Sequence, residues 1–189
     1  IIRLEDAAEC LRDKLLVRLL SRLGCRISEA LGIEVNDIDF VRGAVTIQHL
    51  KVRVKRNCPD CGARLSRTAG FCSGCGREVK KPATEEKEHR RQRQLPVDAD
   101  TLELIKEYIE RGGPVNRNGQ RLLFGLCRHR AWQIVRNCAL KSGLRNLINP
   151  ETGGKRGVSP HRLRDAFAIN AVKHDDSGDG LRLLQEMLG

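Results

Sequence analysis

The chain has 189 residues, a formal net charge of +11 and a charged fraction of 31%. This length suits one ordinary domain, or one domain with a small module, and allows a sizeable core. The longest apolar runs, such as residues 166–169, are far shorter than a membrane span, and charges from Arg3 onward argue against a signal peptide. We therefore expect a cytoplasmic globular protein without a membrane partner.

The basic excess predicts a polyanionic partner. Nucleic acid is the first candidate, because a basic domain gains affinity when phosphates release their counterions. The alternative is a solvated basic surface without a specific ligand. Since only six residues are aromatic, a base-stacking platform for single strands is not expected.

The first part of the chain predicts two helices and a strand. Residues 5–23 carry apolar side chains at spacings of three and four and end at Gly24, which is typical of an amphipathic helix. Ser28 can cap the free N–H groups of a short helix that follows. Residues 44–55 contain β-branched side chains with polar residues between them, and this pattern predicts a strand.

The later part is mostly helical in pattern. The expected elements are a helix that starts at Asp98 or Asp100 and ends before Gly112, a short extended segment at 122–124, a helix at 129–141 with Trp132, Val135 and Ala139 inward, a loop at 149–157, a helix from Ser159-Pro160 to about residue 172, and a helix at 181–188. The order predicts a mainly α fold with a small antiparallel β-hairpin or sheet, of the α+β class.

Four of the eight cysteines form two C-x-x-C-G knuckles that interrupt the predicted hairpin. Their residues are Cys58, Cys61, Cys72 and Cys75. Each knuckle projects two thiolates from one tight turn, and four thiolates suit tetrahedral zinc. A disulfide pair is the weaker alternative, because C-x-x-C is too tight for an unstrained structural bridge. We therefore predict a structural zinc ribbon at residues 56–80.

Two roles are open for this ribbon, which basic residues surround. It can extend the hairpin so that its cations touch DNA phosphates, or it can be a rigid clip that keeps a long hairpin from fraying. The sequence favours neither role over the other.

Three basic elements carry little information singly but more in combination. Arg26 lies in Arg-Ile-Ser-Glu-Ala-Leu-Gly, Lys51 lies on the predicted strand, and His161 and Arg164 lie in Pro-His-Arg-Leu-Arg-Asp-Ala-Phe-Ala. Together with Arg-Gln-Leu-Pro-Val and a final Leu-Gly, this order resembles the catalytic domain of the tyrosine recombinases, the phage integrase family. The resemblance covers nearly all of residues 1–189 except the cysteine-rich insertion.

The resemblance implies a site that binds the scissile phosphate of DNA. Arg26 would be the first catalytic arginine and Arg164 the second, because guanidinium groups offer paired donors to phosphate oxygens and stay charged. His161 would hold the phosphate and assist proton transfer. Lys51 would be the general acid that protonates the leaving 5′ oxygen, with Lys55 and Lys87 as alternatives because the insertion disturbs the register.

The sequence departs from the family pattern in its nucleophile. The resemblance places a His or Trp and then a tyrosine after Gly189, whereas the sequence has one tyrosine, Tyr108, on a predicted helix elsewhere. We interpret Tyr108 as a packing residue. The expectation is a C-terminally truncated catalytic domain that binds double-stranded DNA but is itself inactive.

The leading hypothesis is thus an enzyme, a site-specific DNA recombinase or integrase that works through a 3′-phosphotyrosine. The alternatives are a non-catalytic DNA-binding regulator with a recombinase-like fold, and a zinc-ribbon module for nucleic-acid or protein interaction. The resemblance also implies a homo-tetramer on DNA.

Overall fold

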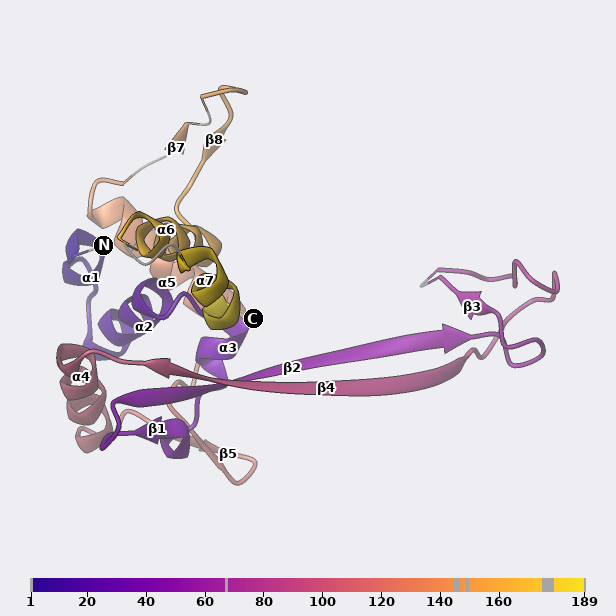
Figure 1. Cartoon of the computed structure of the whole chain (residues 1–189), viewed down its shortest axis with the longest axis horizontal. Coiled ribbons are helices and arrows are strands. Elements are labelled where there is room, and N and C mark those ends of the chain that lie inside the picture. Colours follow the sequence, from indigo (N-terminus) through magenta and orange to yellow (C-terminus); the bar gives the residue numbers. More distant parts are fainter. Residues whose placement is uncertain (1, 67, 145–146, 149, 175–178, 189) are drawn as a thin grey trace. The chain divides into compact units, whose positions relative to one another are not determined.

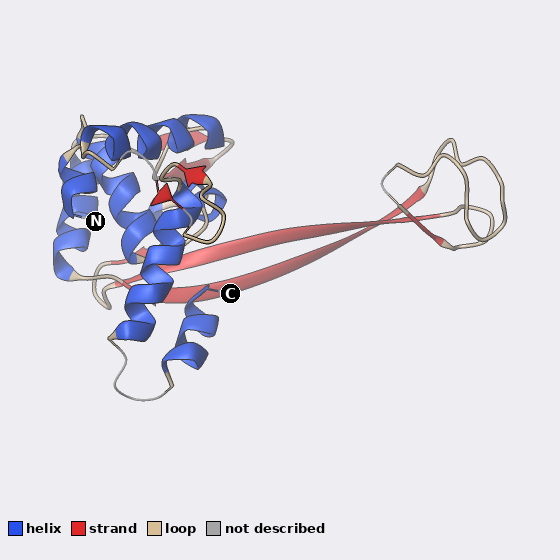
Figure 2. Ribbon diagram, turned by 90° about the horizontal axis from the view of Figure 1, so that it is seen from above, coloured by secondary structure: helices blue, strands red, loops and turns tan. Residues whose placement is uncertain are grey.

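The computed structural model of the chain describes residues 2–66, 68–144, 147–148, 150–174 and 179–188. The helices are α1 (Ile2–Asp6), α2 (Leu11–Arg22), α3 (Ile27–Leu31), the 3₁₀ turn η1 (Val35–Asp37), α4 (Ala99–Glu110), α5 (Arg128–Lys141), α6 (Pro160–Lys173) and α7 (Gly180–Leu188). The strands are β1 (Ile38–Asp39), β2 (Ala44–Asn57), β3 (Arg64–Leu65), β4 (Ala83–Pro96), β5 (Val115–Arg117), β6 (Gln120–Leu122), β7 (Leu147–Ile148) and β8 (Lys155–Arg156) (Figures 1 and 2). Helices combined with antiparallel strand pairs confirm the predicted α+β class.

The chain divides into two compact units. Residues Ile1–Gln48 and Gln92–Gly189 form the first, called here the helical unit, and residues His49–Arg91 form the second, called the cysteine unit. The chain leaves the helical unit along β2 and returns along β4, and these two strands pair with each other. Among the residues described, no helix has the length and apolar character needed to cross a bilayer.

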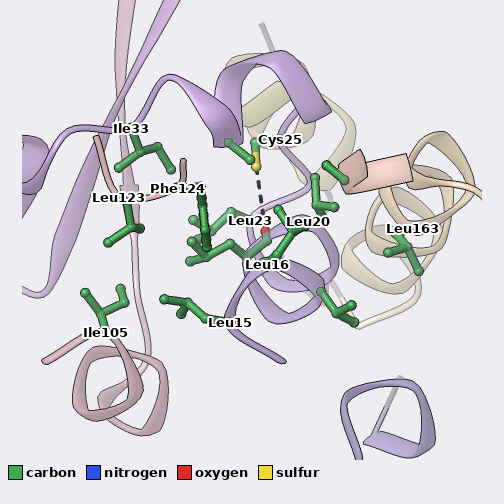
Figure 3. Packing of buried hydrophobic residues seen from close by; sticks show 14 of the residues in the cluster. Leu15, Leu16, Leu20, Leu23, Cys25, Ile33, Ile105, Leu123, Phe124 and Leu163 are labelled. Atoms are coloured by element: carbon green, nitrogen blue, oxygen red, sulfur yellow. Dashed lines mark hydrogen bonds between the residues drawn. The ribbon is translucent and has the colours of Figure 1, made fainter. Parts of the chain in front are cut away.

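Helix α2 lies at the centre of the helical unit and contacts α1, α3, α4, α5 and α6. Its side chains Leu15, Leu16 and Leu20 have no exposed surface, and Ile105 and Phe124 pack into the same core (Figure 3). The apolar side chains of α2 are buried against the neighbouring elements, and each buried Leu adds about 1.5–3 kcal/mol. The core therefore holds the helix ends that frame the site in fixed places.

The helix expected at residues 5–23 is in fact two helices, α1 and α2, so that prediction was wrong at its N-terminal end. The buried carboxylate of Glu5 accepts a hydrogen bond from Arg18 Nε at 2.7 Å. In one continuous helix, residues thirteen positions apart would lie about 20 Å apart along the axis. The break after Asp6 lets α1 fold back on α2, which brings this ion pair together.

Two other local predictions need correction. Ser28 does not cap α3, because the N-cap residue is Arg26, whose backbone N–H donates to Glu29 Oε2 at 2.8 Å. The expected loop at 149–157 contains strand β8, which pairs antiparallel with β7. By contrast, Asp98 caps α4 as predicted and accepts the Thr101 N–H at 3.0 Å.

Gly24 lies in the connection from α2 to α3, two residues before the site residue Arg26. Its φ is +57°, and an added Cβ would lie only 2.3 Å from the ring of Phe167 on α6. The position thus requires glycine for two reasons, a left-handed backbone and close contact with an aromatic ring. This contact sets how closely the α2–α3 connection approaches α6.

We expect Gly24→Ala to destabilise the helical unit by about 3 kcal/mol, from backbone strain and overpacking together. Gly112→Ala is the matched control, because Gly112 has φ +75° but nothing within 4 Å of an added Cβ. Urea unfolding of the two variants separates ring contact from strain. Equal losses of unfolding free energy would mean that the Phe167 contact is unimportant.

Candidate active site

A pocket of about 810 Å³ opens on the helical unit, where the α2–α3 connection meets the first turns of α5 and α6. It is lined by Cys25, Arg26, Ile27, Ser28, Arg128, His129, Trp132, Ser159, Pro160, His161 and Arg164. Three residues predicted as catalytic, Arg26, His161 and Arg164, therefore lie in one pocket. The fold brings together groups from opposite ends of the sequence, and their catalytic roles stay a prediction.

Arg26 lies at the start of α3, where the chain turns out of the left-handed Gly24. Its Nη1 donates to Glu29 Oε1 at 2.8 Å, and 40% of its side chain remains exposed. The guanidinium is thus anchored by Glu29 and is also partly exposed where Arg26 lines the pocket. A partly exposed guanidinium can donate hydrogen bonds to an anion.

Arg164 lies one turn into α6 and is much more buried, with 11% of its side chain exposed. Its Nη1 donates to the carbonyl oxygen of Gly24 at 2.9 Å, and its Nη2 donates to that of Leu188 at 2.8 Å. Burial, together with the nearby charge of Arg26, lowers the pKa of Arg164 from its usual value. Arginine nevertheless keeps its proton in proteins, so this site holds a fixed positive charge.

Glu29 is the carboxylate around which these arginines gather. It is 2% exposed, and besides Arg26 it accepts a hydrogen bond from Arg93 Nη2 at 2.6 Å, while Arg164 Nη1 lies 4.0 Å away. Burial by itself would raise the pKa of Glu29, but the hydrogen bonds from Arg93 and Arg26 outweigh it and lower this pKa. Three guanidinium groups against one carboxylate leave a surplus of two positive charges, which suits a bound phosphodiester.

Sequence reasoning missed Glu29 and Arg93 as parts of this cluster. Glu29 stands three residues after Arg26, which is the spacing of an ion pair on a helix, so a local signal was present. Arg93 gave no such signal, because it comes from β4 and meets Glu29 only through the fold. The Nε of Arg93 is buried without a hydrogen-bond partner among the described atoms, while its Nη2 donates to Glu29.

His161 occupies the first turn of α6 at the mouth of the pocket. Its side chain is 82% exposed, and its Nε2 lies 3.8 Å from Asp165 Oδ1. Asp165 also accepts a hydrogen bond from Arg162 at 3.4 Å. The imidazole is thus accessible to a ligand, with Asp165 one helical turn behind it.

The opposite wall of the pocket is the first part of α5, and it corrects the prediction for Trp132. Trp132 was expected to point inward, but it is 37% exposed, while Val135 and Ala139 are buried as predicted. The ring of Trp132 stacks on His129 at 6.4 Å and carries Arg136 over its face at 5.2 Å. Trp132 is partly exposed because its ring lines the pocket, whereas Val135 and Ala139, further along α5, pack into the core.

The three lysines considered as general acids belong to the hairpin strands. Lys51 and Lys55 lie in β2, and Lys87 lies in β4. The side chains of Lys51 and Lys87 lie outside the described residues, and the side chain of Lys55 is half-buried. The choice among them stays a prediction.

Tyr108 and Cys25 have side chains of nucleophile type, and both are buried. Tyr108 is 5% exposed, packs on Phe124, and donates its hydroxyl to the carbonyl oxygen of Gly113 at 2.9 Å, which confirms its packing role. Burial raises the pKa of the Tyr108 phenol. Cys25 borders the pocket but is fully buried, and burial raises the pKa of its thiol to about 12.

The four knuckle cysteines form a second candidate site inside the cysteine unit. Their sulfur atoms all lie within 4.8 Å of one another, with Cys58 and Cys75 3.8 Å apart and Cys61 and Cys72 3.5 Å apart. A tetrahedral metal with bonds of about 2.3 Å to sulfur needs sulfur separations of about 3.8 Å. The two knuckles close in the same way, with Gly62 and Gly76 in the left-handed region.

The electrostatics of this cluster fit a bound cation. Backbone N–H groups of Cys75 and Gly74 lower the pKa of Cys72 to about 6. The Ala63 N–H would lower the pKa of Cys61, but the sulfurs of Cys72 and Cys75 raise it to about 12. Because neighbouring thiolates oppose each other's ionisation, a full set of four needs a metal ion to balance it.

Comparison with known sequences points to one family. The phage integrase family matches residues 2–67. The tyrosine recombinase XerD of Neisseria meningitidis serogroup B is 27% identical over 192 residues, and the tyrosine recombinase XerC of Roseiflexus sp. is 28% identical over 181 residues. These matches cover 97% and 96% of the chain but only 48% and 44% of the relatives, so the chain spans about half the length of the curated relatives it matches.

Solved structures give the same fold. The XerA recombinase superimposes over 100% of this chain and 53% of its own with a TM-score of 0.63 and 17% identity. The XerH site-specific recombinase bound to its difH substrate superimposes over 100% of this chain and 44% of its own with a TM-score of 0.58 and 22% identity. The chain thus has the catalytic-domain fold of the tyrosine recombinases, the family that its sequence resembles.

We expect Glu29→Gln to lower the free energy of unfolding by about 3–5 kcal/mol at pH 7, because it leaves buried guanidinium groups without their carboxylate. The pKa of Glu29 is lowered below 4.5 by folding, so this stabilisation is complete above pH 4.5 and is lost as the pH falls through the folded-state pKa. Unfolding curves from pH 7 to pH 3 should therefore show wild type and variant converging.

The matched control is Glu107→Gln, which removes a 45% exposed partner of Arg111 on α4. A surface pair of this kind contributes about 0.5 kcal/mol or less. If the two variants lost similar free energy at pH 7, the Glu29 cluster would not be the structural centre of the pocket.

Proposed function

We propose that the chain is the DNA-cleaving catalytic domain of a site-specific recombinase or integrase, which breaks and rejoins double-stranded DNA through a 3′-phosphotyrosine. The observation that carries this proposal is the gathering of Arg26, His161 and Arg164 in one open pocket with surplus positive charge. The names of the relatives and the DNA-bound XerH structure support it.

In this proposal, the two arginines bind the non-bridging oxygens of the scissile phosphate. Attack on phosphorus adds negative charge to the equatorial oxygens, so fixed guanidinium groups stabilise the transition state more than the ground state. Glu29 positions both arginines without neutralising them. His161 donates a hydrogen bond to the same phosphate from the exposed side of the pocket.

The chemical step exchanges one phosphodiester for another. A tyrosine hydroxyl gives its proton to His161 and its oxygen forms a bond to phosphorus, the bond to the 5′ oxygen breaks, and Lys51 gives that oxygen a proton. The reverse reaction with a new 5′ hydroxyl rejoins the strand. Because the hydroxyl of Tyr108 is engaged in the core, the nucleophile comes from outside residues 1–189 in this scheme.

The cysteine unit in this proposal holds one structural zinc ion on Cys58, Cys61, Cys72 and Cys75. Among the described side chains of this unit, four buried residues form the apolar core: Cys58, Leu65, Cys72 and Val79. A core of this size gives little folding energy, whereas zinc binding supplies about 10–16 kcal/mol in zinc-finger peptides. The family resemblance adds assembly as a tetramer on DNA.

The catalytic role of Arg26 is tested in the protein that carries residues 1–189 together with its nucleophile. With a nicked, labelled duplex, Arg26→Ala should slow formation of the covalent complex on a denaturing gel by about 100–1,000-fold, because one phosphate donor is lost. Duplex affinity should change less than tenfold, since many other phosphate contacts remain.

Arg111→Ala is the control, because Arg111 is a 69% exposed arginine at the C-cap of α4, outside the pocket lining. Residues 1–189 alone should form no covalent complex, and a complex that persists in Tyr108→Phe would reveal a different nucleophile. If the intact protein binds duplex DNA but never forms the complex, the non-catalytic DNA-binding regulator is correct.

The zinc assignment predicts the stoichiometry of the purified protein. Wild type should hold about one zinc per chain, and the double variant Cys58→Ser, Cys61→Ser should hold none, because two of the four ligands are gone. The double variant Cys10→Ser, Cys127→Ser is the control, since both cysteines are exposed and stand outside the cluster. Unchanged zinc in the knuckle variant, measured by mass spectrometry of the metal, would contradict the four-cysteine site.

A further inference from the structure

The positive charge of the chain is concentrated in the cysteine unit. Residues 49–91 contain twelve Lys and Arg against five Asp and Glu, so this segment carries +7 of the net +11. The helical unit, which holds the candidate active site, has more than three times as many residues but a surplus of only +4. The net charge per residue of the cysteine unit is thus well above that of the helical unit, and this difference needs an explanation.

The contacts that close the described part of the cysteine unit come from other groups. Its core consists of apolar and cysteine side chains, and its knuckles close through backbone hydrogen bonds such as Cys58 N–H to Ala63 O at 2.8 Å. Arg64 and Lys81 are exposed, and the side chain of Lys80 is 82% exposed. A clip that only keeps the hairpin together would need the cysteines and the core but not the cations.

Attraction to the metal site does not explain the excess either. Four thiolates around a divalent ion carry a net charge of −2, which leaves the unit at about +5 when that charge is included. The N–H that donates to Cys72 Sγ is the backbone N–H of Gly74, at 3.3 Å. Arg77 instead pairs with the carboxylate of Asp60 at 3.4 Å, where its side chain is 70% exposed.

Neighbouring carboxylates leave part of this charge uncompensated. Lys80 lies 3.7 Å from Glu78, and both side chains are more than half exposed, so solvent weakens the pair. For Arg64 and Lys81, no carboxylate in the described part of the cysteine unit lies within ion-pair distance. These three cations are available to an external polyanion.

We propose that the cysteine unit is a second DNA-binding surface, which contacts backbone phosphates of duplex DNA through Arg64, Lys80 and Lys81. The choice of duplex DNA as the polyanion rests on the proposed function of the helical unit. Lys and Arg on an exposed surface bind phosphates without reading bases, so this contact adds affinity and fixes the position of the unit along the duplex. The metal site keeps the three cations on one folded module.

The test measures the salt dependence of binding by the whole chain. Fluorescence anisotropy with a labelled duplex gives the slope of log K against log salt concentration. The triple variant Arg64→Gln, Lys80→Gln, Lys81→Gln should reduce the magnitude of this slope by roughly 2–3, because each lost phosphate contact removes about 0.9. Its zinc content should equal that of wild type, which shows that the cysteine unit is still folded.

The control triple variant Arg42→Gln, Lys106→Gln, Arg111→Gln removes the same charge from exposed positions of the helical unit. Its slope should change by less than 1. A slope that changes equally in both variants, or in neither, would overturn the proposal, and a cysteine unit that binds another protein would leave the slope unchanged.

The two proposals fail separately. If the cysteine-unit variant flattens the slope while the intact protein never forms a covalent complex, the DNA surface stands and the catalytic function falls. If covalent cleavage depends on Arg26 but the slope responds as in the control, the catalytic function stands and the second DNA surface falls.

Discussion

The candidate active site depends on one buried carboxylate. Glu29 is almost fully enclosed, and it orients Arg26 from its own helix and Arg93 from β4 while Arg164 approaches from α6. A single negative charge among three positive ones holds mutually repelling groups together and still leaves a positive surplus. Loss of this carboxylate would leave buried cations uncompensated, so the stability of the helical unit and the shape of the pocket are linked.

The backbone around this cluster is fixed by steric contacts as well as by ion pairs. Gly24 lets the chain turn tightly beneath the ring of Phe167, and its carbonyl oxygen then accepts a hydrogen bond from Arg164. The core around α2 sets the distance between the helices that supply these residues. Apolar packing therefore positions the helices, and the helices position the charged groups of the pocket.

The cysteine unit solves the problem of stability in a different way. Its apolar core is small, and the two knuckles bring four sulfur atoms into a geometry that a metal ion fits. A metal-stabilised module needs few of its side chains for folding, so its surface can carry a high density of cations. Under our proposals, one chain joins a unit that performs chemistry on a phosphate to a unit that binds phosphates along the duplex.

The sequence by itself determined the features whose signals are local. The cysteine spacing predicted the four-sulfur cluster, and helical periodicity located most helices. The order of the expected elements predicted the α+β class, and the motif order singled out Arg26, His161 and Arg164, which line one pocket. The tertiary structure decided the features that rest on distant contacts: the break between α1 and α2 that forms the Glu5–Arg18 pair, the exposure of Trp132, and the recruitment of Arg93 to Glu29. The physical reason is that a spacing along the chain encodes which side chains share a turn or a face, whereas burial and long-range ion pairs exist only after the helices have packed.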